Sequence, residues 1–169
     1  RFLIATFLAG FGGSVFGLLY NLYLLSLGQR EDFIGLVASA TTLTTALSGP
    51  LVVLLIPRLG FRRILILGFG FQVIASTGQA LSTAPVAILA FAAVWGLSAG
   101  FYWAPLPPFL AENSSPGERN HLFAINLAVQ LVAGILGNLV GGQLPALLGT
   151  WNLELGTLNT YRITLLLAT

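Results

Sequence analysis

Long apolar segments alternate with short polar ones along the whole chain. The apolar segments are residues 2–28, 33–56, 64–82, 86–110 and 122–148, and a sixth begins at 161 and runs to 169. At about 1.5 Å per residue, the first segment makes roughly 40 Å of helix, enough to cross a bilayer. The pattern therefore predicts an all-α integral membrane protein with a bundle of six transmembrane helices, the sixth truncated. The sixth segment has about half the residues that a span needs. Because the chain also opens on Arg1, we expect it to be part of a longer protein.

The turn at residues 57–63 sets the expected orientation. It carries three of the seven arginines and separates two apolar segments without any charged residue. Short basic loops stay on the cytoplasmic side of a membrane. With a cytoplasmic amino terminus, the inner segments hold five arginines and the outer turns two. The inner ones are Arg1, Arg58, Arg62, Arg63 and Arg119; the outer ones are Arg30 and Arg162. The charges favour this orientation, and we expect the protein in the plasma (inner) membrane.

Composition agrees with the membrane interpretation. Hydrophobic residues make up 56% of the chain and charged residues 7%, and the mean hydropathy is +0.92. That leaves too little polar surface for a soluble globule. There is no cysteine, which excludes disulfides, thiolate metal sites and cysteine nucleophiles. The arginines are scattered through the loops, so nucleic acid is not an expected partner. No cofactor or metal site is predicted.

Polar side chains recur at helical spacing within the apolar segments. In the first segment the stripe contains Thr6, Gly10, Ser14, Gly17 and Asn21, and Tyr20 lies beside it. Such a stripe either lines a wet cavity or lets helices pack closely through small residues. We expect packing for the glycines and leave both readings open for Asn21. Hydroxyls in the second segment, at Thr41, Thr45 and Ser48, are expected to bond back to their own helix.

The fourth and fifth segments supply further candidates. The fourth has an aromatic stripe that ends at Tyr102 and Trp103, directly before a proline-rich run at 105–108. Aromatic rings with polar groups beside prolines suit a pocket wall, although such stripes also face lipid or a core. The fifth has Asn126 and Gln130 at the polar end of a stripe that continues as glycines.

Residues 96–100 match G-x-S-x-G, the serine hydrolase elbow. That motif needs a strand-to-helix turn and a histidine base. The one histidine, His121, follows a charged loop on the other side of a span. Close packing of helices through Gly96 and Gly100 is the preferred interpretation, and no catalytic residue is predicted.

Residues 58–63, Arg-Leu-Gly-Phe-Arg-Arg, resemble the end of the signature loop of the major facilitator superfamily. The loop before helix five, with Glu112 and Arg119, and the Gly-Asn-Leu-Val-Gly-Gly run at 137–142 extend the resemblance. The run is similar to the G-P-x-x-G-G element of antiporters in that family. Pro57 stands where the family pattern has aspartate, Asn138 where the element has proline, and Ala92 where many members have arginine.

The resemblance implies the six-helix amino-terminal half of a transporter, residues 1–169, packed against a second six-helix half. Substrate would bind near the midplane between halves, with access alternating as one half rocks against the other. The first and fourth helices would line the cavity. The implied substrate contacts are Tyr20, Asn21, Tyr102, Trp103, Asn126 and Gln130. The implied cytoplasmic gate residues are Arg58, Gly60, Arg62, Arg63, Glu112 and Arg119.

The expected function is secondary active or facilitative transport of a small solute across the lipid bilayer. The first, second, third and fifth segments hold no ionisable residue of the kind that usually couples transport to protons. A cavity lined by aromatic and amide groups suggests a neutral or amphipathic solute. Two alternatives remain: a non-transporting membrane anchor or assembly subunit, and a polytopic membrane enzyme. Polar stripes in four of the five complete segments are more than an anchor requires.

Overall fold

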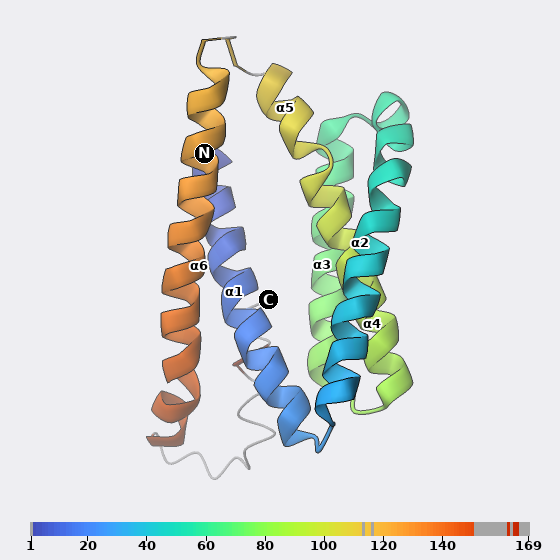
Figure 1. Cartoon of the computed structure of the whole chain (residues 1–169), viewed down its shortest axis with the longest axis vertical. Coiled ribbons are helices and arrows are strands. Elements are labelled where there is room, and N and C mark those ends of the chain that lie inside the picture. Colours follow the sequence, from blue (N-terminus) through green and yellow to red (C-terminus); the bar gives the residue numbers. More distant parts are fainter. Residues whose placement is uncertain (1, 113, 116, 151–161, 163, 166–169) are drawn as a thin grey trace. The chain divides into compact units, whose positions relative to one another are not determined.

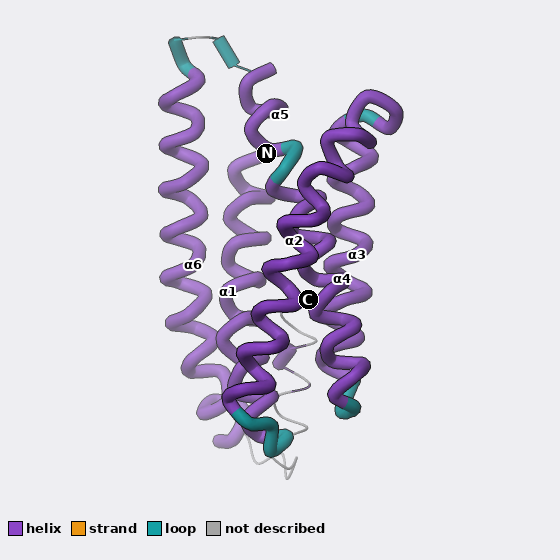
Figure 2. The backbone as a smooth tube through the Cα atoms, turned by 45° about the vertical axis from the view of Figure 1, so that its right-hand side comes forward, coloured by secondary structure: helices purple, strands orange, loops and turns teal. Residues whose placement is uncertain are grey.

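A computed structural model describes residues 2–112, 114, 115, 117–150, 162, 164 and 165. This part of the chain consists of helices joined by short turns (Figures 1 and 2). The helices are α1 Phe2–Ser26, α2 Glu31–Leu59, α3 Phe61–Leu81, α4 Pro85–Trp103, α5 Leu106–Glu112 and α6 Arg119–Thr150. The all-helical prediction is confirmed for these residues.

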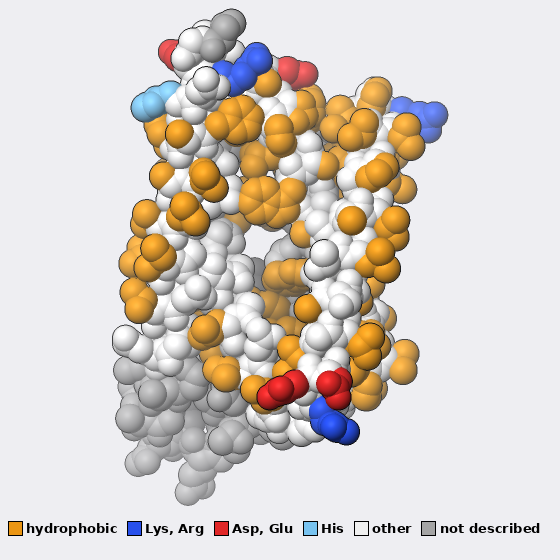
Figure 3. All heavy atoms as spheres, in the orientation of Figure 1, with side chains coloured by type: hydrophobic (Ala, Val, Ile, Leu, Met, Phe, Trp, Pro, Cys, Tyr) orange, Lys and Arg blue, Asp and Glu red, His pale blue; other side chains and the backbone are white. Residues whose placement is uncertain are grey.

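Within the described residues, five helical stretches are long and apolar enough to cross a membrane. They are Leu3–Ser26, Glu31–Leu59, Phe61–Leu81, Pro85–Glu112 and Arg119–Leu144. On the face drawn in Figure 3, charged side chains lie at helix ends and hydrophobic ones along helix flanks. Large apolar side chains such as Leu54 and Ile135 are more than half exposed, as expected for helices surrounded by lipid. The chain is an integral membrane protein. The predicted sixth helix, 161–169, lies outside the described residues except for Arg162, Thr164 and Leu165.

The chain forms two compact units. Unit 1 comprises Arg1–Arg30 and Asn120–Thr169, and unit 2 comprises Glu31–Arg119. Unit 1 therefore contains α1 and α6, which are far apart in sequence, and unit 2 contains the consecutive helices α2 to α5.

Small residues let α1 and α6 pack closely in unit 1. A Cβ atom added at Gly10 would lie 3.3 Å from the Cβ of Ala133, and one added at Gly141 would lie 3.3 Å from the Cα of Val15. A Cβ atom added at Gly137 would likewise lie 3.0 Å from the Cβ of Ser14. The contacts advance along both helices together, so the helices run parallel. The prediction that glycines serve packing is confirmed at Gly10, whereas a Cβ at Gly17 would meet nothing within 4 Å.

A second small-residue contact joins α2 to α4 in unit 2. A Cβ at Gly96 would meet Thr41 and Thr44, and a Cβ at Gly100 would meet Ser48. The Thr45 hydroxyl lies 2.8 Å from the carbonyl oxygen of Thr41 in its own helix and 3.0 Å from that of Gly96. The prediction of bonding within the helix is thus correct, and the structure adds a hydrogen-bond acceptor on the neighbouring helix.

Helix α3 packs antiparallel against another side of α4. A Cβ at Gly68 would lie 3.1 Å from the Cβ of Phe101. Phe101 also forms a buried cluster with Val52 of α2 and Ile64 of α3. Both neighbours of α4 are therefore fixed by close contacts, and α4 is the central helix of unit 2.

The basic turn is shorter than the sequence predicts. We expected a polar hinge over residues 57–63, but α2 continues through Pro57 to Leu59 and α3 begins at Phe61. Only Gly60 separates them, with φ 76 and ψ 158, a conformation that is essentially restricted to glycine. Pro57 lies inside the last turn of α2, where its missing N–H leaves the Val53 carbonyl oxygen without its helical donor.

The sequence predicts a span over 86–110 with a kinking proline run at 105–108, and the structure has one apolar stretch, Pro85–Glu112, whose helix is interrupted at that run. The stretch divides at Ala104 and Pro105 into α4 and α5. Pro105, Pro107 and Pro108 have no N–H to donate to the carbonyl oxygens of α4. Regular helix therefore ends at Trp103 and begins again at Leu106.

Candidate substrate-binding and gate residues

Tyr20 and Asn21 of α1 are neighbours in very different surroundings. The Tyr20 side chain is 6% exposed, and its ring stacks on Phe16 with ring centroids 5.5 Å apart. The centroid of the Tyr23 ring lies 6.4 Å from that of Tyr20, with the planes inclined by 32°. Asn21 is exposed. Only Asn21 is therefore directly accessible.

Asn126 and Gln130 lie on the side of α6 that faces α1. A Cβ at Gly10 would lie 3.8 Å from the Gln130 carbonyl oxygen. Asn126 precedes Gln130 by one helical turn, as Thr6 precedes Gly10, so Asn126 and Thr6 lie level in this parallel pair. Asn126 is buried and Gln130 half-buried.

The four candidates in unit 1 do not form a single site. Tyr20 lies almost four helical turns beyond Thr6 on α1, roughly 20 Å at 1.5 Å per residue. Because Asn126 lies level with Thr6, the structure separates the amide pair on α6 from Tyr20 and Asn21. Sequence periodicity shows which residues share a face of one helix. It does not show which residues of two helices lie at the same height along their axes, so it could not predict this separation.

Three buried polar atoms have no hydrogen-bond partner among the described residues: Thr6 Oγ1, Tyr20 Oη and Asn126 Oδ1. All three belong to unit 1. Buried polar groups in membrane spans are normally paired, because an unmade hydrogen bond there is costly. Tyr20 and Asn126 were candidates from the sequence. Thr6 was noted only as part of a stripe.

Arg162 contacts α1 in a way that the sequence did not reveal. Its Nε donates a hydrogen bond to the Tyr23 hydroxyl oxygen over 3.2 Å, and the Tyr23 side chain is fully buried. We had used Arg162 only to predict orientation. The available signal was its position as a lone charge at the start of an apolar segment.

Tyr102 and Trp103 meet at the end of α4. Their ring centroids are 5.3 Å apart and their planes are inclined by 82°. Tyr102 is half-buried and contacts the Phe69 ring of α3 edge-on at 6.3 Å. Trp103 is 49% exposed. The structure thus joins these two candidates in one accessible aromatic corner next to the helix break.

Ser98, the serine of the G-x-S-x-G match, is held in a packing contact. Its hydroxyl oxygen lies 2.7 Å from both Gln72 Oε1 and the Trp95 carbonyl oxygen. Gly96 and Gly100 on either side pack against α2. The motif lies inside a helix instead of a strand-to-helix turn, so the geometry favours packing over a catalytic elbow.

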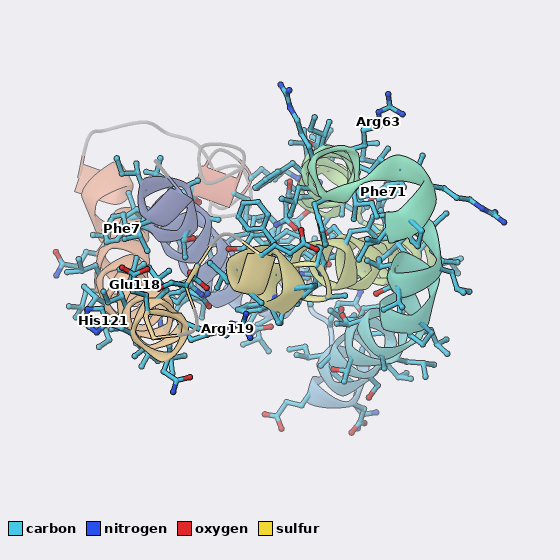
Figure 4. All side chains as sticks on the ribbon, turned by 90° about the horizontal axis from the view of Figure 1, so that it is seen from above. Phe7, Arg63, Phe71, Glu118, Arg119 and His121 are labelled. Atoms are coloured by element: carbon cyan, nitrogen blue, oxygen red, sulfur yellow. The ribbon has the colours of Figure 1, made fainter. Side chains whose placement is uncertain are left out.

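The predicted gate residues of unit 2 gather at one end of its helices. Gly60 separates Arg58 from Arg62 and Arg63, and the Phe61 ring meets the Phe109 ring of α5 at 6.4 Å. The arginines are exposed, and Figure 4 shows Arg63 pointing away from the helices.

Glu112 and Arg119 border the loop between α5 and α6. Both are exposed, and Arg119 Nη2 donates to the Ala111 carbonyl oxygen over 3.1 Å. In the described part of the chain, Glu112 has no ion pair with Arg58, Arg62 or Arg63. The gate network therefore stays a prediction. The described residues also contain no group of three acidic or histidine side chains placed to hold a metal ion.

The comparison with protein families identifies the architecture. The family model of the Major Facilitator Superfamily matches residues 2–162. The chain belongs to the major facilitator superfamily. Members of this family are transporters, and the resemblance of the chain to this family is confirmed. The presence of glycine at position 60 also has a physical explanation, because the turn between α2 and α3 needs a backbone conformation that is essentially restricted to glycine. A search of curated proteins found no match.

Proposed function

We propose that the chain is the amino-terminal half of a transporter that moves a small neutral or amphipathic solute by alternating access. A second six-helix half would pack against it. Membership of the major facilitator superfamily supports transport. The amino terminus is proposed to be cytoplasmic and the membrane to be the plasma membrane, because five arginines against two favour that orientation.

The observation that carries the proposal is the set of unpaired buried atoms in the α1·α6 pair. Tyr20 Oη and Asn126 Oδ1 lie inside membrane spans and have no hydrogen-bond partner among the residues that the structure describes. If these residues served packing alone, their buried polar atoms should be hydrogen-bonded or replaced by apolar ones. Each buried polar atom without a hydrogen bond costs about 1–3 kcal/mol. Solute or water that reaches them in one state of the cycle would remove that cost. Their separation along α1 suggests successive contacts instead of one pocket.

We propose that the exposed Trp103 and Asn21 side chains and the half-buried Tyr102 and Gln130 side chains complete the solute contacts. Arg58, Arg62, Arg63, Glu112 and Arg119 are proposed to form ion pairs in the states where the cytoplasmic side is closed. An exposed pair contributes about 0–1 kcal/mol, but several together can bias a switch whose two states differ by a few kcal/mol. Gly60 supplies the turn that positions three of them.

Affinity measurements with paired variants test the proposed contacts. In proteoliposomes of the full-length protein, Tyr102→Ala and Asn21→Ala should raise the KM for uptake. Leu22→Ala is the matched control, since Leu22 is an exposed neighbour of Asn21 without a polar group. Unchanged KM in both contact variants, with normal KM in the control, would contradict the assignment.

One alternative is a non-transporting anchor or assembly subunit, which the polar packing between α2 and α4 fits. An anchor predicts that removal of Asn21 or Tyr102 changes only stability, with no solute flux in any variant. The same experiment therefore distinguishes the two functions.

A further inference from the structure

The proline run after α4 frees backbone acceptors beside the aromatic corner. In a continuous helix, the carbonyl oxygens of Phe101, Trp103 and Ala104 would accept from the N–H groups four residues later. Those residues are Pro105, Pro107 and Pro108, which have no N–H. Three of four consecutive carbonyl oxygens therefore lose their usual donor within one turn.

The corner is accessible beside the Trp103 and Ala104 carbonyls, whereas Phe101 and Pro105 are buried. Trp103 is 49% exposed, and Pro107 and Pro108, whose missing N–H groups free the last two carbonyls, are exposed as well. The rings of Tyr102 and Trp103 lie at 82° to each other with centroids 5.3 Å apart, so they form two walls. Of the residues in α4 and α5, only Glu112 is charged, and it is acidic.

All these groups attract the same kind of ligand. Carbonyl oxygens that have lost their helical donors carry partial negative charge and are strong hydrogen-bond acceptors. The faces of tryptophan and tyrosine rings attract cations, tryptophan most strongly. These groups supply no positive charge for a carboxylate or phosphate, and a purely apolar solute would leave the carbonyls unmatched.

We infer that the end of α4 is a subsite for an organic ammonium group, with Trp103 and Tyr102 as its walls and the proline-freed carbonyls as its polar contacts. The inference rests on the proposed function and narrows its amphipathic solute to one with an ammonium head and an apolar body. The apolar body would lie along the neighbouring aromatic side chains.

Binding of a matched pair of probes tests the charge requirement. Choline and its neutral carbon analogue 3,3-dimethylbutanol have almost the same shape and differ in charge. Full-length protein in detergent should bind choline, or the more apolar benzyltrimethylammonium, with a rise in Tm and a change in tryptophan fluorescence. The neutral analogue should bind at least several-fold more weakly. Equal affinities for choline and 3,3-dimethylbutanol, or no binding of either ammonium probe, would overturn the inference.

Two sets of variants test the residues. Trp103→Leu should weaken ammonium binding about tenfold, and Trp103→Phe by less, because phenylalanine keeps a ring with a weaker cation attraction. Pro107→Ala returns an N–H to the Trp103 carbonyl, so it should weaken binding although it stabilises the helix. Pro85→Ala is the matched control. Pro85 opens α4, where its missing N–H frees no carbonyl within the helix.

The outcomes distinguish this inference from the proposed function. Normal ammonium affinity in Pro107→Ala and Trp103→Leu would overturn the subsite even if solute transport is observed. Ammonium binding that these variants weaken, without any flux, would support the subsite and contradict transport. A purely structural role of the prolines predicts that Pro107→Ala changes Tm alone.

Discussion

Gly100→Ala tests the packing that holds unit 2 together. A Cβ atom at this position would overlap the Ser48 hydroxyl and lie 2.7 Å from the Ser48 Cβ and 3.1 Å from the Thr45 carbonyl oxygen. The Thr45 backbone and the short Ser48 side chain cannot make room without moving the rest of α2. The added methyl group therefore pushes α2 and α4 apart. The Thr45 to Gly96 hydrogen bond, 3.0 Å long and one turn away, would lengthen with them.

The magnitude follows from three terms. Overpacking costs about 1–3 kcal/mol, and a weakened bond between membrane helices costs about 0.6 kcal/mol. Alanine returns about 1 kcal/mol through its higher helix propensity. We expect a net loss of roughly 0.5–2.5 kcal/mol in the free energy of unfolding. Gly70→Ala in α3 is the control, because a Cβ there meets nothing within 4 Å, and it should be neutral or slightly stabilising.

The assay is reversible unfolding of the purified full-length protein in mixed micelles, followed by circular dichroism. The double variant Gly100→Ala, Ser48→Gly removes both overlapping atoms, so it should lose less stability than the two single changes added together. If Gly100→Ala is as stable as Gly70→Ala, the described α2·α4 contact is wrong.

Three further predictions follow from individual contacts. Gly60→Ala forces alanine into a conformation essentially restricted to glycine and should cost about 1–3 kcal/mol in chemical unfolding; a loss below 0.5 kcal/mol, taken as the order of a neutral surface change, would refute the turn. Ser98→Ala removes the donor to Gln72 and should cost about 1–2 kcal/mol, and wild-type protein should not react with a fluorophosphonate; labelling of Ser98 would revive the hydrolase alternative. Arg162→Gln and Tyr23→Phe should each lower Tm, and a double-mutant cycle should show coupling of about 1 kcal/mol or more; strict additivity would mean that the bond does not form in solution.

Sequence periodicity predicted the membrane spans because lipid imposes one simple rule, that every span is long, apolar and helical. The expected ends of the first three segments lie within a few residues of the ends of α1, α2 and α3. The turn at Gly60 and the break at Pro105 were less well predicted. Proline does not always end a helix: α2 contains Pro50 and Pro57, whereas three prolines within four residues at 105–108 interrupt the fourth segment.

The candidate site could be predicted only in part from the sequence. Helical spacing correctly grouped Asn126 and Gln130 on one face, but it could not show that this face packs on α1. The levels of Thr6 and Asn126 depend on how two helices 100 residues apart align, and that alignment is set by Gly10 and Gly137. The bond between Arg162 and Tyr23 is equally non-local, so neither residue's immediate sequence indicates it.

Solute flux through the full-length protein tests the central claim most directly. Liposomes containing the protein would be assayed for uptake and efflux of a panel of neutral, ammonium-bearing and anionic solutes, with and without a pH gradient. The account predicts protein-dependent movement of at least one neutral or ammonium-bearing amphipathic solute. Movement driven by the gradient would indicate a secondary active transporter, and movement without it a facilitator. Correctly folded protein that moves no member of the panel, or only anions, would contradict the account.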